Sequence, residues 1–283
     1  MKGTRTMAAL GRILLATDLE PKSDRAMERA VQLARQFGAE LTALHIVQGE
    51  DGAYAHLPLH HIEAEMQRLL LAVPGGAGLP VRAVAVRGGA VGPEVAGYAG
   101  QWRPDLVVVG GHARNRVTGL FLPATVERIA VADDTPVLAV WDKPQGPYAR
   151  ALVPVDFSPR SRATVAAARH LLPEGTLHLL HVLDLPSTAR PTGDEAAVQR
   201  AFAEEFATLL DGIPGDGVRC EVCIGTPAVE IVRAARLERH DLVVMGSARR
   251  NGVMRAVLGS VAQAVLTELS CDALLAGDTG PVP

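Results

Sequence analysis

The stretch Asp-Leu-Val-Val-Met-Gly at residues 241–246 decides how this chain folds, and a loop connects it to Gly259 and Ser260. Its apolar run is typical of a buried strand, and the pattern at 262–266 predicts that a helix begins at Gly259-Ser260. Glycine lets backbone approach an oxyanion closely, and the free N–H groups and dipole of a helix start attract it. Ser260 adds a hydroxyl that could cap the helix or bind a phosphate oxygen. The stretch therefore predicts a strand, a loop and a helix start that suit phosphate.

Most of this pattern occurs twice. The stretch at 239–246 matches one at 103–110, 136 residues earlier (239 minus 103), and two further pairs of segments match in the same order. Ordered matches of this kind indicate a tandem duplication, and the period is far too long for a solenoid, so each copy is a domain. The matching pairs are Ile13–Asp18 with Ala151–Asp156, Leu44–Ile46 with Leu180–Val182, and Arg103–Gly110 with Arg239–Gly246.

We expect the first domain at residues 1–143 and the second at 149–283, because two prolines and a glycine break regular structure between Asp142 and Tyr148. Strand and helix patterns alternate in each copy, and runs such as Leu-Val-Val-Val indicate a parallel sheet that is covered on both faces. Right-handed crossovers then give a doubly wound, three-layer α/β domain. Such a domain binds ligands beyond the carboxyl ends of its strands, where Asp156 and Gly246 are expected.

The expected elements follow one plan in both copies. The alternating residues of 80–86 favour a strand at a sheet edge. Gly38 is placed to end the first helix. The predicted strands are 12–17, 41–47, 80–86, 106–109 and 137–140, then strands near 151, 177, 218 and 242 and at 273–275; the predicted helices are 22–37, 60–73, 94–102 and 126–132, then helices near 162, at 195–210, near 229 and after 260.

Composition excludes several partners. The chain has 283 residues with 28 basic and 31 acidic side chains, a net charge of −3, and only 4% aromatic residues. This balance predicts neither nucleic-acid nor anionic-membrane binding. Since no run reaches the ~18 apolar residues of a membrane span and residues 1–12 lack the apolar core of a signal peptide, we expect a cytoplasmic protein.

Cysteines and histidines give no clear metal or redox site, and we expect no metal ligands. Cys220 and Cys223 form a CxxC pair, but their spacing in an expected strand puts them on opposite faces. His56 and His60 are four residues apart, a spacing that could serve zinc on a helix, but the intervening Pro58 argues against one. Solvated loop histidines are therefore the preferred interpretation for this group. His45 and His181 each end an apolar strand, where a satisfied structural histidine is expected.

The motifs of the second copy resemble those of the universal stress protein family in its tandem form. These are Val153–Ser158 with Ser161, Leu180–Val182, Gly225–Pro227 and the loop from Gly246 to Ser260. The resemblance covers nearly the whole chain and implies two tandem Rossmann-like domains. ATP-binding members carry G-x2-G-x9-G-[ST] in this loop, and the corresponding residues here are Gly246, Arg249, Gly259 and Ser260.

The resemblance also implies where a nucleotide would sit. Asp156 and the backbone of Val182 would hold the adenine end, and Pro154 and Met245 would line the pocket. The loop from Gly246 and the Gly259-Ser260-Val261 turn would hold the phosphates of ATP or another adenine nucleotide, with or without Mg²⁺.

Arg249 departs from the family pattern, since it replaces the second glycine. Its side chain could block the approach of backbone to phosphate, could replace amide contacts with a charge-assisted one, or could be a solvated loop arginine like Arg250. We expect nucleotide binding to be retained, because the anion site at the helix start survives.

The first copy departs further. Its corresponding positions are Gly110, Ala113, Pro123 and Ala124. Proline has no N–H to donate and alanine has no hydroxyl, so this copy is not expected to bind ATP. We interpret Asp18 and the glycines at 110–111 as residues that keep a tight turn, and His112 as a weaker candidate for an anion contact.

The sequence favours a nucleotide-binding stress factor that regulates or protects, rather than an enzyme. It contains no GxxxxGK[ST], GxGxxG, GxSxG or HExxH motif and no recognisable catalytic residues. Two alternatives remain: a slow ATPase on the same scaffold, and a nucleotide-free module that binds a small ligand or a protein. The family resemblance implies an intramolecular pseudo-dimer through the final strands at 136–140 and 273–275, and a homodimer is a further expectation.

Overall fold

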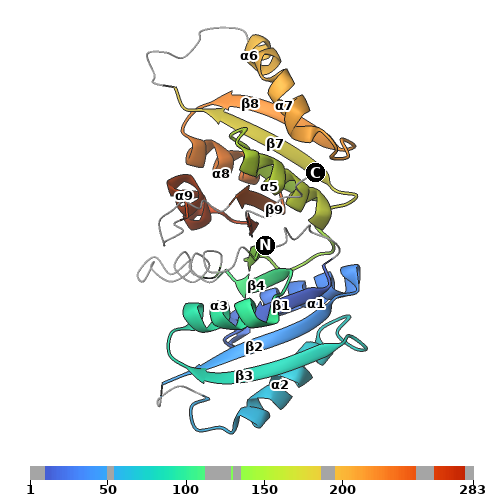
Figure 1. Ribbon diagram of the computed structural model, residues 1–283, viewed down its shortest axis with the longest axis vertical. Coiled ribbons are helices and arrows are strands. Elements are labelled where there is room, and N and C mark those ends of the chain that lie inside the picture. The colour runs from blue at the N-terminus through green and yellow to red at the C-terminus, as the bar shows by residue number, and fades with distance from the viewer. Residues whose placement is uncertain are drawn as a thin grey trace, which may run out of the picture. The chain divides into compact units, whose positions relative to one another are not determined.

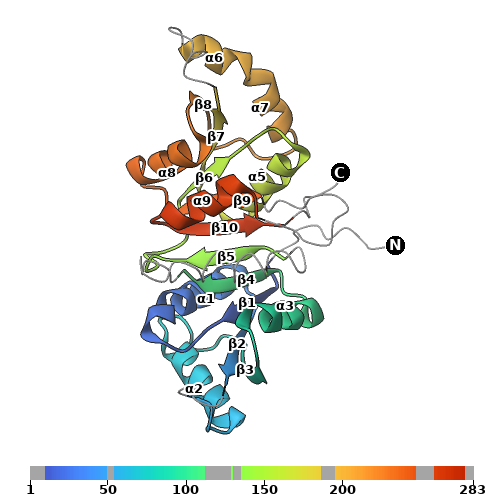
Figure 2. The ribbon, with the colours of Figure 1, turned by 90° about the vertical axis from the view of Figure 1, so that its left-hand side faces the viewer.

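A computed structural model of the chain describes residues 10–49, 54–111, 129, 135–185, 195–246 and 258–277. Its contacts divide the described chain into two compact units, which meet in sequence between Pro147 and Tyr148. Figures 1 and 2 show the helices and strands of each unit. The two units are called the first and the second unit below, in chain order.

The first unit contains a parallel sheet in the order β3-β2-β1-β4-β5. Figure 2 shows α1 and α2 on one face of this sheet and α3 on the other. The outer position of β3 confirms the edge strand that its alternating residues predicted. The elements are β1 (Arg12–Ala16), α1 (Asp24–Phe37) after a short 3-10 turn (Pro21–Ser23), β2 (Glu40–Gln48), α2 (Leu59–Ala72), β3 (Val81–Gly88), α3 (Val91–Trp102), β4 (Leu106–Gly110) and β5 (Val137–Val140).

The second unit repeats this plan with a parallel sheet in the order β10-β9-β6-β7-β8. In Figure 2, α8 and α9 cover one face, and α5 and α7 cover the other. The elements are β6 (Arg150–Pro154), α5 (Pro159–Leu171), β7 (Thr176–Leu183), α6 (Glu195–Ala201), α7 (Ala203–Leu210), β8 (Val218–Ile224), α8 (Pro227–Leu237), β9 (Leu242–Gly246), α9 (Ser260–Glu268) and β10 (Asp272–Ala276).

The central strands are buried as their apolar runs predicted. Val107 in β4 and Val243 in β9 are fully buried, as expected for strands that have helices on both faces. Gly38 ends α1 in the left-handed conformation with φ 66°, which glycine adopts without steric cost. Each unit is therefore the three-layer, doubly wound α/β domain that the sequence predicted.

Two details differ from the expected elements. The helix expected over 195–210 is two helices, α6 and α7, because Phe202 between them leaves helical geometry. The ring of Phe202 packs on Phe157 and His181, with centroids 5.8 and 5.0 Å away. The helix expected at 126–132 lies outside the described residues, apart from the helical Ile129. Among the described helices, none is long and apolar enough to cross a membrane.

Candidate functional site

A pocket of about 320 Å³ lies in the second unit, at the carboxyl ends of three neighbouring strands. Pro154 ends β6, Val182 lies near the end of β7, and Gly246 ends β9. The chain leaves β6 toward β7 and β8 and later returns to β9 on the other side of β6, so the pocket lies at the switch point of the sheet. Its volume is near the lower limit of roughly 300–1,000 Å³ that is usual for small-molecule sites.

Three helices begin at this pocket. Ser158 is the N-cap of α5, Pro227 is the first residue of α8, and Gly259 is the N-cap of α9, and all three line the pocket. The first N–H groups of a helix lack partners within the helix, and the helix dipole adds partial positive charge there. Arg160, in the first turn of α5, is a basic residue of the same lining. The pocket therefore attracts anions.

Asp156 is the acidic residue of the described lining, and the turn after β6 fixes its side chain. Its Oδ1 accepts hydrogen bonds from the Ser161 hydroxyl at 2.7 Å and from the Ser158 backbone N–H at 3.0 Å. Partial burial alone would raise the pKa of Asp156, but the hydrogen bonds from Ser158 and Ser161 outweigh it and lower the pKa below its ordinary value. Asp156 is therefore a fixed, ionised acceptor at neutral pH.

His181 has a structural hydrogen bond next to the pocket. Its Nδ1 donates to the backbone oxygen of Val155 at 2.8 Å, and its ring contacts Phe157 at a centroid distance of 4.7 Å. His45 in the first unit donates in the same way to the oxygen of Thr17, at 2.9 Å. Both histidines tie the second strand of their unit to the first, which agrees with the satisfied role that the sequence predicted.

The walls of the pocket are apolar and tightly packed. Leu180 and Ile231 are almost fully buried and Met245 is 5% exposed. A Cβ atom on Gly246 would lie 3.1 Å from Oγ1 of Thr164, so any larger residue at this position would make a tight contact with Thr164.

The pocket brings together seven of the nine residues that the sequence predicted to hold a nucleotide. Ser260 is the first residue of α9 and is exposed directly after the lining residue Gly259. Because Gly259 is the N-cap, the suggested capping role of Ser260 is not observed, which leaves its other suggested role as a phosphate contact. Arg249 lies outside the described residues. The seven are Pro154, Asp156, Val182, Met245, Gly246, Gly259 and Val261.

Sequence reasoning missed Arg160 and Thr164 as lining residues. The signal for both was their position in the first two turns of α5, just after the predicted strand end at Asp156. A helix that starts at the carboxyl edge presents its first turns to that edge.

The first unit retains the turn but is described only in part where its phosphate loop was predicted. Gly111 lies against Trp141, since a Cβ atom at this glycine would be 2.4 Å from the indole ring. This contact supports the interpretation that the glycine keeps a tight turn. His112, Ala113, Pro123 and Ala124 lie outside the described residues.

The other candidates from the sequence show no catalytic environment. His56, His60 and His61 are exposed, and His56 precedes Pro58, the N-cap of α2, so it does not share a helical face with His60. Burial raises the pKa of the Cys223 thiol to about 11, so it is a thiol rather than a thiolate at neutral pH.

The duplicated doubly wound sheet, with a pocket at the switch point, defines a tandem α/β protein of the Rossmann-like class. A model of the universal stress protein family matches residues 10–140 and 147–276. This chain therefore belongs to the universal stress protein family, and both of its halves carry the family domain.

Individual relatives match about half of the chain. A universal stress protein of Methanocaldococcus jannaschii is 28% identical over 141 residues, which are 45% of this chain and 81% of the relative. The universal stress protein A homolog 1 of Coxiella burnetii is 29% identical over 139 residues, which are 46% of this chain and 96% of the relative. The alignment lengths agree with a duplicated domain.

A solved structure matches the whole length. The crystal structure of a universal stress protein from Archaeoglobus fulgidus aligns with 95% of this chain and 98% of its own, with a TM-score of 0.66 and 19% identity. At this identity the match shows a common fold.

Proposed function

We propose that the second unit binds an adenine nucleotide, and that the protein acts as a stress-response regulatory or protective factor through this binding. The proposal rests on the pocket of the second unit, where the Asp156 carboxylate and the starts of three helices face one apolar cavity. A nucleotide needs these features together: hydrogen-bond acceptors for its base or ribose, apolar contact for the ring, and donors for its phosphates.

Asp156 and Val182 serve the nucleoside end in this proposal. A carboxylate that stays ionised accepts hydrogen bonds from ribose hydroxyls or an exocyclic amine. The backbone of Val182 adds main-chain polar groups, while Pro154 and Met245 pack on the flat base.

Gly259, Ser260 and Val261 serve the phosphate end, because they form the start of α9. Amides at a helix start bind phosphate oxygens, and the Ser260 hydroxyl adds a donor. Arg160 is a basic residue in the lining of the same pocket. Arg249 could assist or block phosphate binding. Comparing the nucleotide affinity of Arg249→Gly with that of the wild type distinguishes the two.

Binding rather than turnover is the function that this chemistry favours. Asp156 is held by Ser158 and Ser161, and these hydrogen bonds lower its pKa, which makes it a weak general base. A slow, metal-assisted ATPase is the second candidate function, and ATP turnover by pure protein that Ser260→Ala abolishes would support it.

The test uses the full-length protein. We expect mass spectrometry to find an adenine nucleotide in protein denatured after native purification, and calorimetry to show binding of ATP, ADP or AMP. Asp156→Asn should weaken binding more than 10-fold, since it removes the negative acceptor from the pocket. Asp18→Asn is the matched control, because Asp18 accepts a hydrogen bond from Ser23 as Asp156 does from Ser161, but in the first unit.

The proposal fails if no nucleotide is released and none binds, which leaves the nucleotide-free interaction module. Equal weakening by Asp18→Asn and Asp156→Asn would also contradict it, since the effect would then be one of folding. The domain limits at 1–143 and 149–283, the pseudo-dimer, the homodimer and the cytoplasmic location stay predictions of the sequence.

A further inference from the structure

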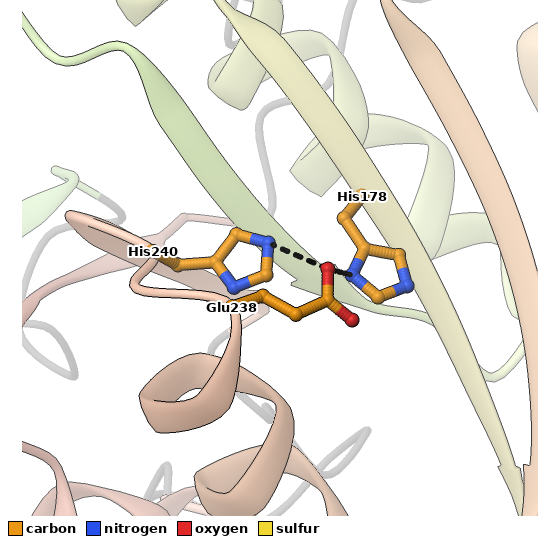
Figure 3. Close-up of side chains that lie close together, drawn as sticks. All are labelled: His178, Glu238 and His240. Carbon is orange, nitrogen blue, oxygen red and sulfur yellow. Dashed lines mark ion pairs between the residues drawn. The ribbon is translucent and has the colours of Figure 1, made fainter.

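Three side chains converge at the opposite edge of the second sheet from the pocket. His178 is the third residue of β7, and Glu238 and His240 lie in the turn between α8 and β9, near the amino ends of the strands. Their ligand atoms all lie within 4.8 Å of one another. Figure 3 shows the Glu238 carboxylate between the two imidazole rings.

We propose that His178, Glu238 and His240 bind one divalent transition-metal ion of the zinc class, which ties the α8–β9 turn to β7. Two imidazoles and one carboxylate are a ligand set that Zn²⁺ accepts, and a water molecule would complete a tetrahedral site. This site does not depend on the proposed nucleotide function, because it lies at the other edge of the sheet.

The distances suit such an ion. Glu238 Oε2 lies 3.4 Å from His178 Nδ1 and 4.0 Å from His240 Nε2. Ligands around a tetrahedral Zn²⁺, with bonds of about 2.0–2.2 Å, are about 3.3 Å apart. The three atoms are therefore near the spacing of a tetrahedral site, and binding one ion would draw them closer together.

His178 provides a second line of evidence, because it is buried without a satisfactory partner. Its side chain is 5% exposed, and neither ring nitrogen makes a hydrogen bond of acceptable geometry to another described residue, although carboxylate oxygens lie 3.1 and 3.4 Å away. Buried polar nitrogens in proteins are nearly always satisfied. A cation between Nδ1 and Glu238 removes this defect.

The surrounding groups place a lone pair on each ligand atom. Glu221 Oε2 lies 3.1 Å from His178 Nε2, so a small turn of the ring would let Nε2–H donate to Glu221 and would leave Nδ1 to bind an ion. His240 Nδ1 donates to the Ala234 oxygen at 3.3 Å, which leaves its Nε2 toward Glu238. Such outer partners orient the ligands of known metal sites.

Both histidines are shifted toward the form that binds metals. Burial lowers the pKa of His178 and of His240, although the Glu238 carboxylate opposes the shift in both, and the neutral imidazole is the form that binds a metal. Glu238 Oε2 itself accepts from Arg219 Nη1 at 2.8 Å, so an ion at this oxygen would share it with the guanidinium.

The test titrates the full-length protein, freed of metal by a chelator, with Zn²⁺ in a calorimeter and with Co²⁺ as an absorption probe. We expect one equivalent to bind, with the visible bands of tetrahedral Co²⁺ and a raised Tm. Glu238→Gln and His240→Gln should each weaken binding at least about 100-fold, and Glu221→Gln about 10–100-fold, as removal of an outer partner does.

The double variant His60→Gln/His61→Gln is the matched control, because it removes two neighbouring exposed histidines and should leave binding unchanged. If His240→Gln fails to fold, Glu238→Gln decides, since the Glu238 side chain is 37% exposed and tolerates change. The proposal is overturned if the wild type binds no equivalent, if Glu238→Gln binds as the wild type does, or if binding is lost in the His60/His61 control.

Discussion

The hydroxyl of Ser161 accepts a hydrogen bond from the backbone N–H of Asp156 at 3.0 Å and donates one to the Asp156 carboxylate at 2.7 Å. The pair closes the turn between β6 and α5 and holds the carboxylate at the pocket. In the first unit, the Ser23 hydroxyl donates to Asp18 Oδ1 across the same spacing of five residues. Duplication thus preserved this turn in both units.

Ser161→Ala should destabilise the protein and weaken nucleotide binding together. The variant loses two hydrogen bonds, each worth about 1 kcal/mol, so the free energy of unfolding should fall by roughly 1–2 kcal/mol. Urea unfolding and calorimetry measure the two effects. Ser23→Ala is the control, with a similar loss of stability and unchanged affinity; a loss of affinity in Ser23→Ala would show that the turn acts through folding alone.

Acid should remove the contribution of Asp156 to stability. Because the pKa of Asp156 is lower in the folded protein than in the unfolded chain, its ionised form stabilises the fold above the ordinary aspartate pKa of about 3.9. This contribution is lost as the pH falls from there through the folded pKa. The difference in stability between wild type and Asp156→Asn, measured by urea unfolding, should therefore be full near pH 7 and shrink as the pH falls below about 3.9. A difference that does not change with pH would contradict the lowered pKa.

The residues of the pocket could be predicted because they belong to short sequence motifs, most of which occur in both copies of the domain. Gly246, Gly259 and Asp156 each follow a recognisable strand or precede a helix, and the shared topology brings the carboxyl ends of parallel strands together. His178 and His240 could not be predicted as a pair, since His240 lies in a connecting turn whose packing the strand order does not specify. They meet only because the α8–β9 turn packs on β7, which is tertiary information. The break at Phe202 was missed for the same reason: its ring packs on residues far away in sequence.

Gly111→Ala should destabilise the first unit through a steric clash. A Cβ atom at this position would meet Trp141 Cδ2 at 2.4 Å, so the indole must move. Such overpacking costs about 1–3 kcal/mol, which thermal unfolding can measure. Gly97→Ala is the matched control, because nothing lies within 4 Å of its Cβ position inside α3, and the change should stabilise the helix by about 0.5–1 kcal/mol. Unchanged stability in Gly111→Ala would show that Trp141 does not pack on this turn.

Tyr148→Phe should destabilise the second unit by leaving a buried carboxylate with one donor fewer. The Tyr148 hydroxyl donates to Asp272 Oδ2 at 2.6 Å, and the two residues are 5% and 0% exposed. Leaving a buried acceptor without this donor costs about 1–3 kcal/mol. Urea unfolding measures it against Tyr98→Phe, a change at a half-exposed tyrosine in α3 that should cost little. Equal effects of the two variants would mean that the hydroxyl of Tyr148 contributes nothing specific to the packing of β10.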